Sequence, residues 1–198
     1  MNEDAIRQAR DVYKIEADDL LKMSEVFDEE KFVKAILLLK NASNIAATGC
    51  GHSGILCEHF AHLMCCINKP AKFISPCEAL HGGMGFLKKN DVMIFASRGG
   101  KTSELVPMLD VCKKMGVKII AITENTESVI AKQADVVLKM IVTRETDRFN
   151  SQGTTSSTAL IAMFHSLQAA LIYETGFTNQ QFAVIHPGGA VGERINNK

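Results

Sequence analysis

The stretch Asp91–Glu104, DVMIFASRGGKTSE, passes from a run of apolar residues into a loop of glycines, hydroxyl groups and charges. Its first part, Asp91–Ser97, is nearly continuous in apolar residues, which is typical of a strand covered on both faces of a parallel sheet. The loop that follows contains two glycines, two cations and two hydroxyl side chains, and Ser97 adds a third hydroxyl at the end of the strand. Hydroxyl donors suit phosphate oxygens, so we expect a buried strand whose end can hold an anion. An N-cap is an alternative and compatible role, with Thr102 or Ser103 capping a helix and Glu104 in its first turn.

Four more apolar runs have the character of strands, and segments long enough for helices separate them. The runs are Asn44–Thr48, Ala71–Ser75, Val117–Thr123 and Asp135–Met140. The helical segments are Gly54–Cys66, Thr102–Met115 and Ser128–Gln133. This alternation predicts an α/β fold in three layers, with a doubly wound parallel sheet of five strands between helices. Ligands of such a sheet bind beyond the carboxyl ends of its strands, so the site is expected there.

Helices are also expected at both ends of the 198-residue chain. Apolar residues recur at helical spacing over the first forty residues, and the acids Asp28–Glu30 suit the first turn of a second helix. A long helix is expected at about Ser156–Tyr173, followed by an irregular, glycine-rich tail, Gly176–Lys198. The length suits a single domain. Residues 1–42 would form an N-terminal helical pair, and residues 43–198 would form the sheet core and the tail.

Charge and apolar content exclude several classes of protein. Lys plus Arg and Asp plus Glu each number 22, so the formal net charge is zero. Such a balance argues against a general nucleic-acid binder and leaves room for a local site for one small anion. No stretch reaches the ~18–20 uninterrupted apolar residues of a membrane span, and no apolar run of a signal peptide follows the charged N-terminus. We therefore expect a cytoplasmic protein that binds neither nucleic acid nor membrane, with its six cysteines as free thiols.

Two further loops share the composition of the loop after Asp91–Ser97. Thr48–Gly54, TGCGHSG, has three glycines, which let the backbone approach a ligand closely, and Ser53 adds a hydroxyl. It is neither a Walker A loop nor a full dinucleotide fingerprint, and alone it is equally typical of a tight turn. A third hydroxyl cluster, Thr154–Thr158, opens the long C-terminal helix. Three such clusters at one end of a sheet together predict a phosphate pocket.

These motifs resemble those of a known family. The segments G-C-G-H-S-G, S-R-G-G-K-T-S-E and T-T-S-S-T resemble a sugar isomerase (SIS) domain. Within that family the sequence is most similar to D-arabinose 5-phosphate isomerases, through Glu78–Gly85, Arg144-Glu145 and His186–Gly192. The resemblance covers about residues 40–195 and implies the flavodoxin-like SIS fold. Many relatives continue into a pair of CBS domains, so a single SIS domain without them is expected here.

The resemblance also implies a site and an assembly. The family binds a sugar phosphate at the strand ends, often in a site that a neighbouring subunit completes, which implies a homodimer or homotetramer. Substrate and phosphate contacts are expected from Gly51, His52, Ser53, Ser97, Arg98, Lys101, Thr102, Thr154 and Ser157.

The implied reaction is aldose–ketose isomerisation through an enediol. A base takes the proton from C2 and returns it to C1, which requires a positioned carboxylate or imidazole and donors for the enediolate charge. Glu145 or Glu104 is the candidate base, and His186 the candidate acid, proton shuttle or ring-opening residue. His81 is a candidate to polarise the carbonyl. The sequence leaves the division of these roles open, and the chemistry requires no organic cofactor and no metal.

Two departures from the family leave other functions open. The isomerases carry lysine where this chain has His52, and their S-x-S-G pattern is broken by Gly99. One alternative is therefore another SIS isomerase, acting for example on a hexulose phosphate, and a second is a non-catalytic sugar-phosphate-binding module. His59 and His62 share a face of a predicted helix, but without a CxxC pair they are expected to pack and not to bind metal.

Overall fold

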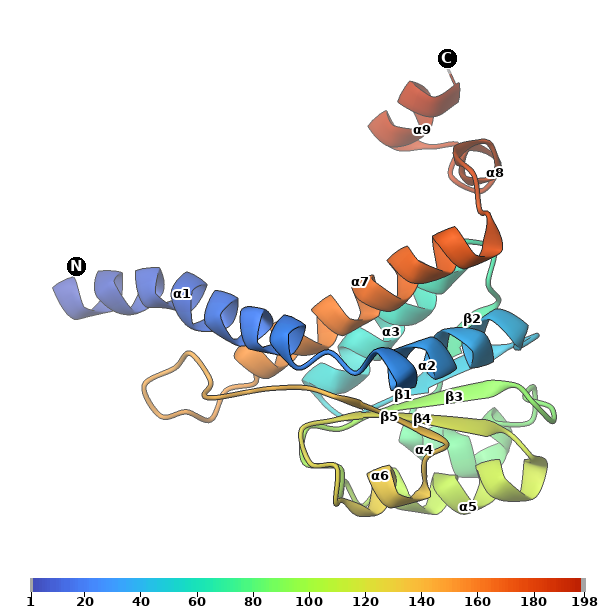
Figure 1. The fold of residues 1–198 in the computed structure, drawn as a ribbon, viewed down its shortest axis with the longest axis horizontal. Coiled ribbons are helices and arrows are strands. Elements are labelled where there is room, and N and C mark those ends of the chain that lie inside the picture. The colour runs from blue at the N-terminus through green and yellow to red at the C-terminus, as the bar shows by residue number, and fades with distance from the viewer. Residues whose placement is uncertain (1, 197–198) are drawn as a thin grey trace.

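The computed structural model describes residues 2–196 and shows a parallel sheet of five strands between two layers of helices (Figure 1). The strands are β1 (Ile45–Thr48), β2 (Ala71–Phe73), β3 (Val92–Ala96), β4 (Lys118–Thr123) and β5 (Val136–Lys139). Their order is β2-β1-β3-β4-β5, and each neighbouring pair is parallel. This is a flavodoxin-like, doubly wound order, so the predicted fold class is confirmed.

Helices cover each face of the sheet. One layer contains α1 (Glu3–Glu25), α2 (Glu29–Asn41), α3 (His52–Cys65) and α7 (Thr155–Thr175). The other contains α4 (Pro76–Glu78), the π-helical turn η1 (Ala79–Gly83), α5 (Val106–Met115) and α6 (Val129–Gln133). Asp28 caps α2 by accepting from the Lys31 N–H at 3.0 Å, and Glu29 and Glu30 lie in the first turn, where the sequence predicted acids.

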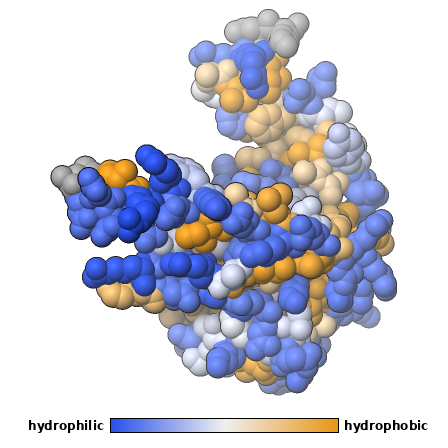
Figure 2. Space-filling view, turned by 60° about the vertical axis from the view of Figure 1, so that its left-hand side comes forward, coloured by the Kyte–Doolittle hydropathy of each residue, from blue (hydrophilic) through white to orange (hydrophobic). Residues whose placement is uncertain are grey.

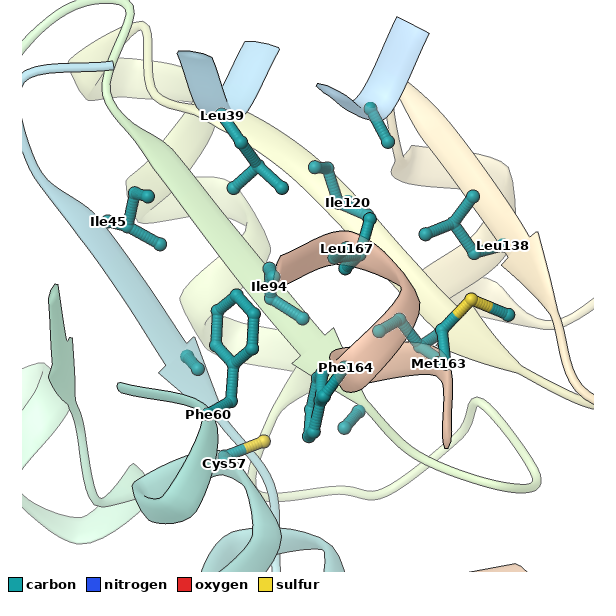
Figure 3. Close-up of a cluster of buried hydrophobic side chains, with 14 of the residues drawn as sticks. Leu39, Ile45, Cys57, Phe60, Ile94, Ile120, Leu138, Met163, Phe164 and Leu167 are labelled. Atoms are coloured by element: carbon teal, nitrogen blue, oxygen red, sulfur yellow. The ribbon is translucent and has the colours of Figure 1, made fainter. Parts of the chain in front are cut away.

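The strands are buried because alternate side chains enter two separate cores. Ile94 of β3 faces the first core, whereas Met93 and Phe95 of the same strand face the second. In the first core the rings of Phe60 and Phe164 lie 4.6 Å apart between centroids, joining α3 to α7 (Figure 3). Apolar residues on both faces explain the continuous apolar runs of the sequence.

The long helix α7 meets the length and composition of a membrane span. It is the one helix within residues 2–196 that does so, and its apolar side packs in the first core against α2 and α3. All six cysteines are free thiols, as expected.

The structure corrects two expectations about helices. The tail expected to be irregular contains α8 (Asn179–Ile185) and α9 (Gly189–Asn196). Thr178 and Gln181 form a capping box at the start of α8, a signal that the nearby glycines masked. The N-cap role of Thr102 or Ser103 is also wrong, because α5 starts after Leu105 and no side chain caps it.

The two short C-terminal helices form an arm, residues 179–196, that lies beyond the C-terminal end of α7 (Figure 1). The start of α7 lies at the opposite end of that helix, beside the carboxyl ends of the strands. At ~1.5 Å per residue, a 21-residue helix separates the arm from those strand ends by roughly 30 Å.

Candidate functional site

The loop after β3 is closed on itself by hydroxyl groups. The Ser97 and Thr102 hydroxyl oxygens lie 2.8 Å apart, and the Gly100 N–H donates to the Ser97 hydroxyl at 3.1 Å. Gly100 has a positive φ of 64°, and a Cβ there would lie 2.0 Å from the Ser128 hydroxyl oxygen. Gly99 is exposed, and a Cβ would meet nothing within 4 Å. The position where the family pattern has serine therefore has room for one.

The glycine loop after β1 lies beside this loop, because Thr48 of β1 is in register with Phe95 of β3. Gly51 precedes α3 with a φ of 57°, in the region that favours glycine. Ser53 makes no side-chain hydrogen bond within residues 2–196, so its hydroxyl is free for a ligand. The helix N-terminus adds backbone N–H groups and the positive end of a dipole.

His52 ties the glycine loop to the segment before α7. Its Nδ1 lies 3.1 Å from the Gly153 carbonyl oxygen. A carbonyl only accepts, so Nδ1 carries the proton in this bond. The Ser157 hydroxyl donates to the same oxygen at 2.5 Å. His52 and Ser157 therefore both bind the chain itself, although both were predicted to contact substrate.

A buried carboxylate lies where β3, β5 and α7 meet. Glu145 is 2% exposed, and its Oε1 accepts from Arg98 Nη1 at 2.7 Å. Its Oε2 accepts from the Thr154 N–H at 2.8 Å, the Thr154 hydroxyl at 3.2 Å and the Ser156 N–H at 3.2 Å. Burial raises the pKa of Glu145, but the hydrogen bonds from Ser156 and Thr154 and the charge of Arg98 outweigh it. The net pKa lies below the usual range.

Arg98 also pairs with a second carboxylate, which the sequence reasoning missed. Arg98 Nε donates to Glu124 Oε2 at 2.7 Å. Glu124 follows β4, and Arg98 follows β3, the neighbouring strand. Strand adjacency brings the two together, and only the strand order would have revealed it. Lys101 is exposed and makes no ion pair within the described part of the chain.

The segment from Glu145 to Gly153 is also ordered by residues outside the predicted set. Asp147 accepts from the backbone N–H groups of Phe149, Ser151 and Gln152 at 2.8–2.9 Å. Asn150 accepts from the Glu145 N–H at 2.6 Å. An Asp and an Asn three residues apart are a turn signal that was available in the sequence.

The second acid, Glu104, is exposed beside the glycine loop. The Ser103 hydroxyl donates to its Oε2 at 2.6 Å, and this bond lowers the pKa of Glu104. Burial raises the pKa of Cys50 in the glycine loop, and the negative charge of Glu104 raises it further. Glu104 therefore lies at the same edge of the sheet as Cys50.

The two predicted histidines lie in different places. His81 is exposed in η1, which follows β2 at the strand-end edge. His186 caps α8 in the arm, stacks on Phe182 with ring centroids 4.9 Å apart, and leaves its Nδ1 buried and unpaired among the described residues. One chain therefore does not bring His186 to the loops.

An apolar hollow lies away from these loops. It measures about 560 Å³ and is lined mainly by apolar side chains of α1, α2, β5 and α7, including Leu20, Phe27, Phe32 and Met163. The predicted site is open in a single chain.

Known proteins resemble the chain in sequence and structure. Residues 38–172 match the profile of the SIS domain. Arabinose 5-phosphate isomerase KdsD of Pseudomonas aeruginosa is 38% identical over 167 residues, which is 84% of this chain and 51% of that protein. The chain thus spans about half the length of this curated relative.

Two solved structures match over their whole length. One, from Listeria monocytogenes, is described as a candidate sugar-phosphate isomerase. It is 38% identical with a TM-score of 0.90 and covers 95% of this chain and 100% of its own. The other, from Escherichia coli CFT073, is in complex with A5P. It is 28% identical with a TM-score of 0.84, and the match covers 94% of this chain and 100% of the E. coli chain. The predicted resemblance is confirmed, and the chain belongs to the SIS domain family.

Proposed function

We propose that the chain is an aldose–ketose isomerase that interconverts arabinose 5-phosphate and ribulose 5-phosphate. The observation that carries this proposal is the meeting of three loops at one sheet edge. The loops after β1 and β3 carry glycines and hydroxyl side chains. The third loop, after β5, brings Glu145 beside Arg98. The E. coli structure in complex with A5P, matched over its whole length, supports the substrate class.

The phosphate binds the loops after β1 and β3 in this proposal. Ser53 offers a free hydroxyl, and Ser97 and Thr102 offer a pair of hydroxyls that can turn from each other to a ligand. Gly51 and the start of α3 add backbone donors, and Lys101 adds a free cation. Thr154 and Ser157 remain predicted contacts. Their hydroxyls already bind the chain, which favours a place at the wall of the site and not at its phosphate.

The reaction needs a proton transfer between C1 and C2. A carboxylate takes the proton from C2 of the open-chain aldose, the C2–H electrons form the C1=C2 bond, and O1 takes a proton. O2 then gives up its proton as C2=O forms, and C1 receives the proton from the carboxylic acid. His186 serves as acid, shuttle or ring-opening residue, and His81 polarises the carbonyl oxygen. Neither imidazole is held by a carboxylate within residues 2–196.

The site is completed by a second copy of the chain in a homodimer or homotetramer. The arm of residues 179–196 packs on itself and exposes apolar side chains, with Val184 79% exposed (Figure 2). It also carries His186, whose place in the site then depends on the neighbour. Free thiols at all six cysteines are consistent with a cytoplasmic location.

The test is exchange of the C2 proton with solvent, followed by NMR in D₂O over pentose, hexose and heptose phosphates. Exchange and product formation with arabinose 5-phosphate, and none with unphosphorylated arabinose, are expected. Exchange with a hexulose phosphate alone would assign a different SIS isomerase. Calorimetric binding without exchange for every sugar would assign a sugar-phosphate-binding module.

A further inference from the structure

Arg98 is held from two sides and through both its side chain and its backbone. Its guanidinium donates to Glu124 and to Glu145, each at 2.7 Å. Its carbonyl oxygen accepts from the Thr123 hydroxyl at 2.8 Å and from the Glu124 N–H at 3.0 Å. Charge-assisted bonds of this length are among the stronger side-chain hydrogen bonds. Two of its five N–H donors are therefore bound to carboxylates, and its charge is balanced by two negative charges, which favours a supporting role over phosphate binding.

Glu145 is 2% exposed, and both of its oxygens already have donors. Its Oε2 accepts three hydrogen bonds and its Oε1 accepts one, from Arg98, so the carboxylate is enclosed by donors of the chain and is not open to a substrate. Two of these come from backbone N–H groups at the start of α7, where an anion is favoured by the helix dipole. Its pKa also lies below the usual range, because these hydrogen bonds and Arg98 outweigh the effect of burial. A general base needs a free lone pair and reach to its proton.

Glu104 differs from Glu145 in its exposure and in its hydrogen bonds, although the bond from Ser103 lowers its pKa as well. It is exposed at the open edge of the site, and only its Oε2 accepts a hydrogen bond, from Ser103. Its Oε1 has no partner within residues 2–196. Of the two acids in the site, only Glu104 has an oxygen available to a bound sugar.

We propose that Arg98 is a positioning residue that fixes Glu145 as the anion at the start of α7, and that Glu104 is the carboxylate that takes the C2 proton. The proposal rests on the isomerase function proposed above. It assigns Arg98 the role of supporting the loop that joins β5 to α7, in place of the phosphate contact that the sequence predicted. That loop supplies the wall of the site and, through Gly153, the partner of His52.

The first test separates positioning from phosphate binding. Arg98→Gln is expected to lower kcat at least tenfold and to leave KM for arabinose 5-phosphate within about threefold, because Arg98 does not touch the phosphate. Arg98→Lys, which keeps a cation beside Glu145, is expected to recover part of kcat. Lys118→Gln is the matched control, because it removes an exposed 3.2 Å ion pair at the far end of β4 and should change neither constant. A large rise in KM with kcat nearly unchanged would overturn the proposal.

The pH profile identifies the base. The acidic limb of kcat/KM is expected to stay in place in Arg98→Gln, because Arg98 makes no contact with Glu104. If Glu145 were the base, loss of the neighbouring cation would raise its pKa and move that limb to higher pH. Glu104→Gln is expected to abolish C2 exchange while arabinose 5-phosphate still binds by calorimetry. A shifted limb, or exchange that survives in Glu104→Gln, would refute the assignment.

A measurement without substrate separates this inference from the proposed function. Arg98→Gln is expected to speed amide hydrogen exchange in residues 144–156, because Glu145 then loses its cation, and to leave exchange in α5 unchanged. Unchanged exchange in residues 144–156 would refute the positioning role even in an active enzyme. Faster exchange there, in a protein whose wild type isomerises no sugar, would retain the positioning role and refute the isomerase.

Discussion

Gly99 and Gly100 are neighbours in the loop after β3, yet only Gly100 is in a position that excludes a side chain. Gly100 combines a positive φ with contact to Ser128, whereas Gly99 faces open space. A side chain at position 100 must therefore adopt a strained backbone and displace the Ser128 side chain. The sequence shows only two adjacent glycines, and this difference depends on Ser128, 28 residues further along the chain.

Gly100→Ala is expected to destabilise the protein by about 2–4 kcal/mol, from backbone strain plus the clash with Ser128. Gly99→Ala, the matched control, is expected to change stability by less than about 0.5 kcal/mol, as exposed substitutions usually do. Urea denaturation of both variants measures the difference. Equal stabilities would mean that the loop does not have the packed geometry described here.

The motifs named candidate site residues in the two glycine loops but not the contacts that hold these residues in place. Arg98 pairs with residues 26 and 47 positions away, which meet only because β3 lies next to β4 and the segment after β5 returns to α7. No local pattern encodes such partners. The burial of Glu145 among four donor groups likewise follows from the path of the chain, so the sequence could name two acids but not divide their roles.

At the level of helices and strands, the sequence predicted the sheet well because the central strands β1, β3 and β4 are covered on both faces. All five strands lie within the predicted apolar runs, and in the three central strands burial on both faces leaves no polar alternation to confuse the pattern. The first residues of the helices were predicted less accurately than the strands. α5 begins four residues later than predicted, because Thr102–Leu105 forms a turn closed by the Leu105 N–H and the Thr102 carbonyl. The helices of the arm were missed because they bury little apolar surface of their own.

Asp91 joins two of these elements through a buried carboxylate. It accepts from the N–H groups of Ser43, Asn44 and Lys88 at 2.8–3.1 Å, which ties the start of β3 to the turn between α2 and β1. Burial raises its pKa, but the bonds from Asn44, Lys88 and Ser43 outweigh burial and hold the pKa below the usual range. A lowered pKa means stability that is present above the ordinary value and lost as the pH falls through the lowered one.

Asp91→Asn is therefore expected to be less stable than wild type at neutral pH. The difference should shrink in acid as the pH falls through the lowered pKa of Asp91, where the wild-type carboxyl is also protonated. Denaturation midpoints across a pH series measure this convergence. Asp11→Asn, an exposed change on α1, is the control, and its denaturation midpoint should equal that of wild type at every pH. A deficit that is constant with pH would mean that the carboxylate charge is not what stabilises the turn.

For the whole molecule, the decisive feature is that a single chain holds Glu104 and His186 at separate places. Glu104 lies at the strand ends, and His186 lies in an arm beyond the far end of α7, roughly 30 Å away by helix length. An arm whose two helices pack on each other and expose apolar residues suits exchange with another copy. If the copies exchange arms, each site combines Glu104 of one chain with His186 of its neighbour.

Mixed oligomers test this arrangement directly. Glu104→Gln and His186→Ala are each expected to be inactive alone. Unfolding and refolding them together at equal amounts should restore about a quarter of the wild-type sites, because a site is intact only when each chain supplies its unmutated residue. Mixing without unfolding, if subunits do not exchange, is the control and should restore nothing. The idea fails if the refolded mixture stays inactive while each variant alone forms the wild-type oligomer by sedimentation. It fails equally if wild type is an active monomer, because His186 must then act within its own chain or not at all.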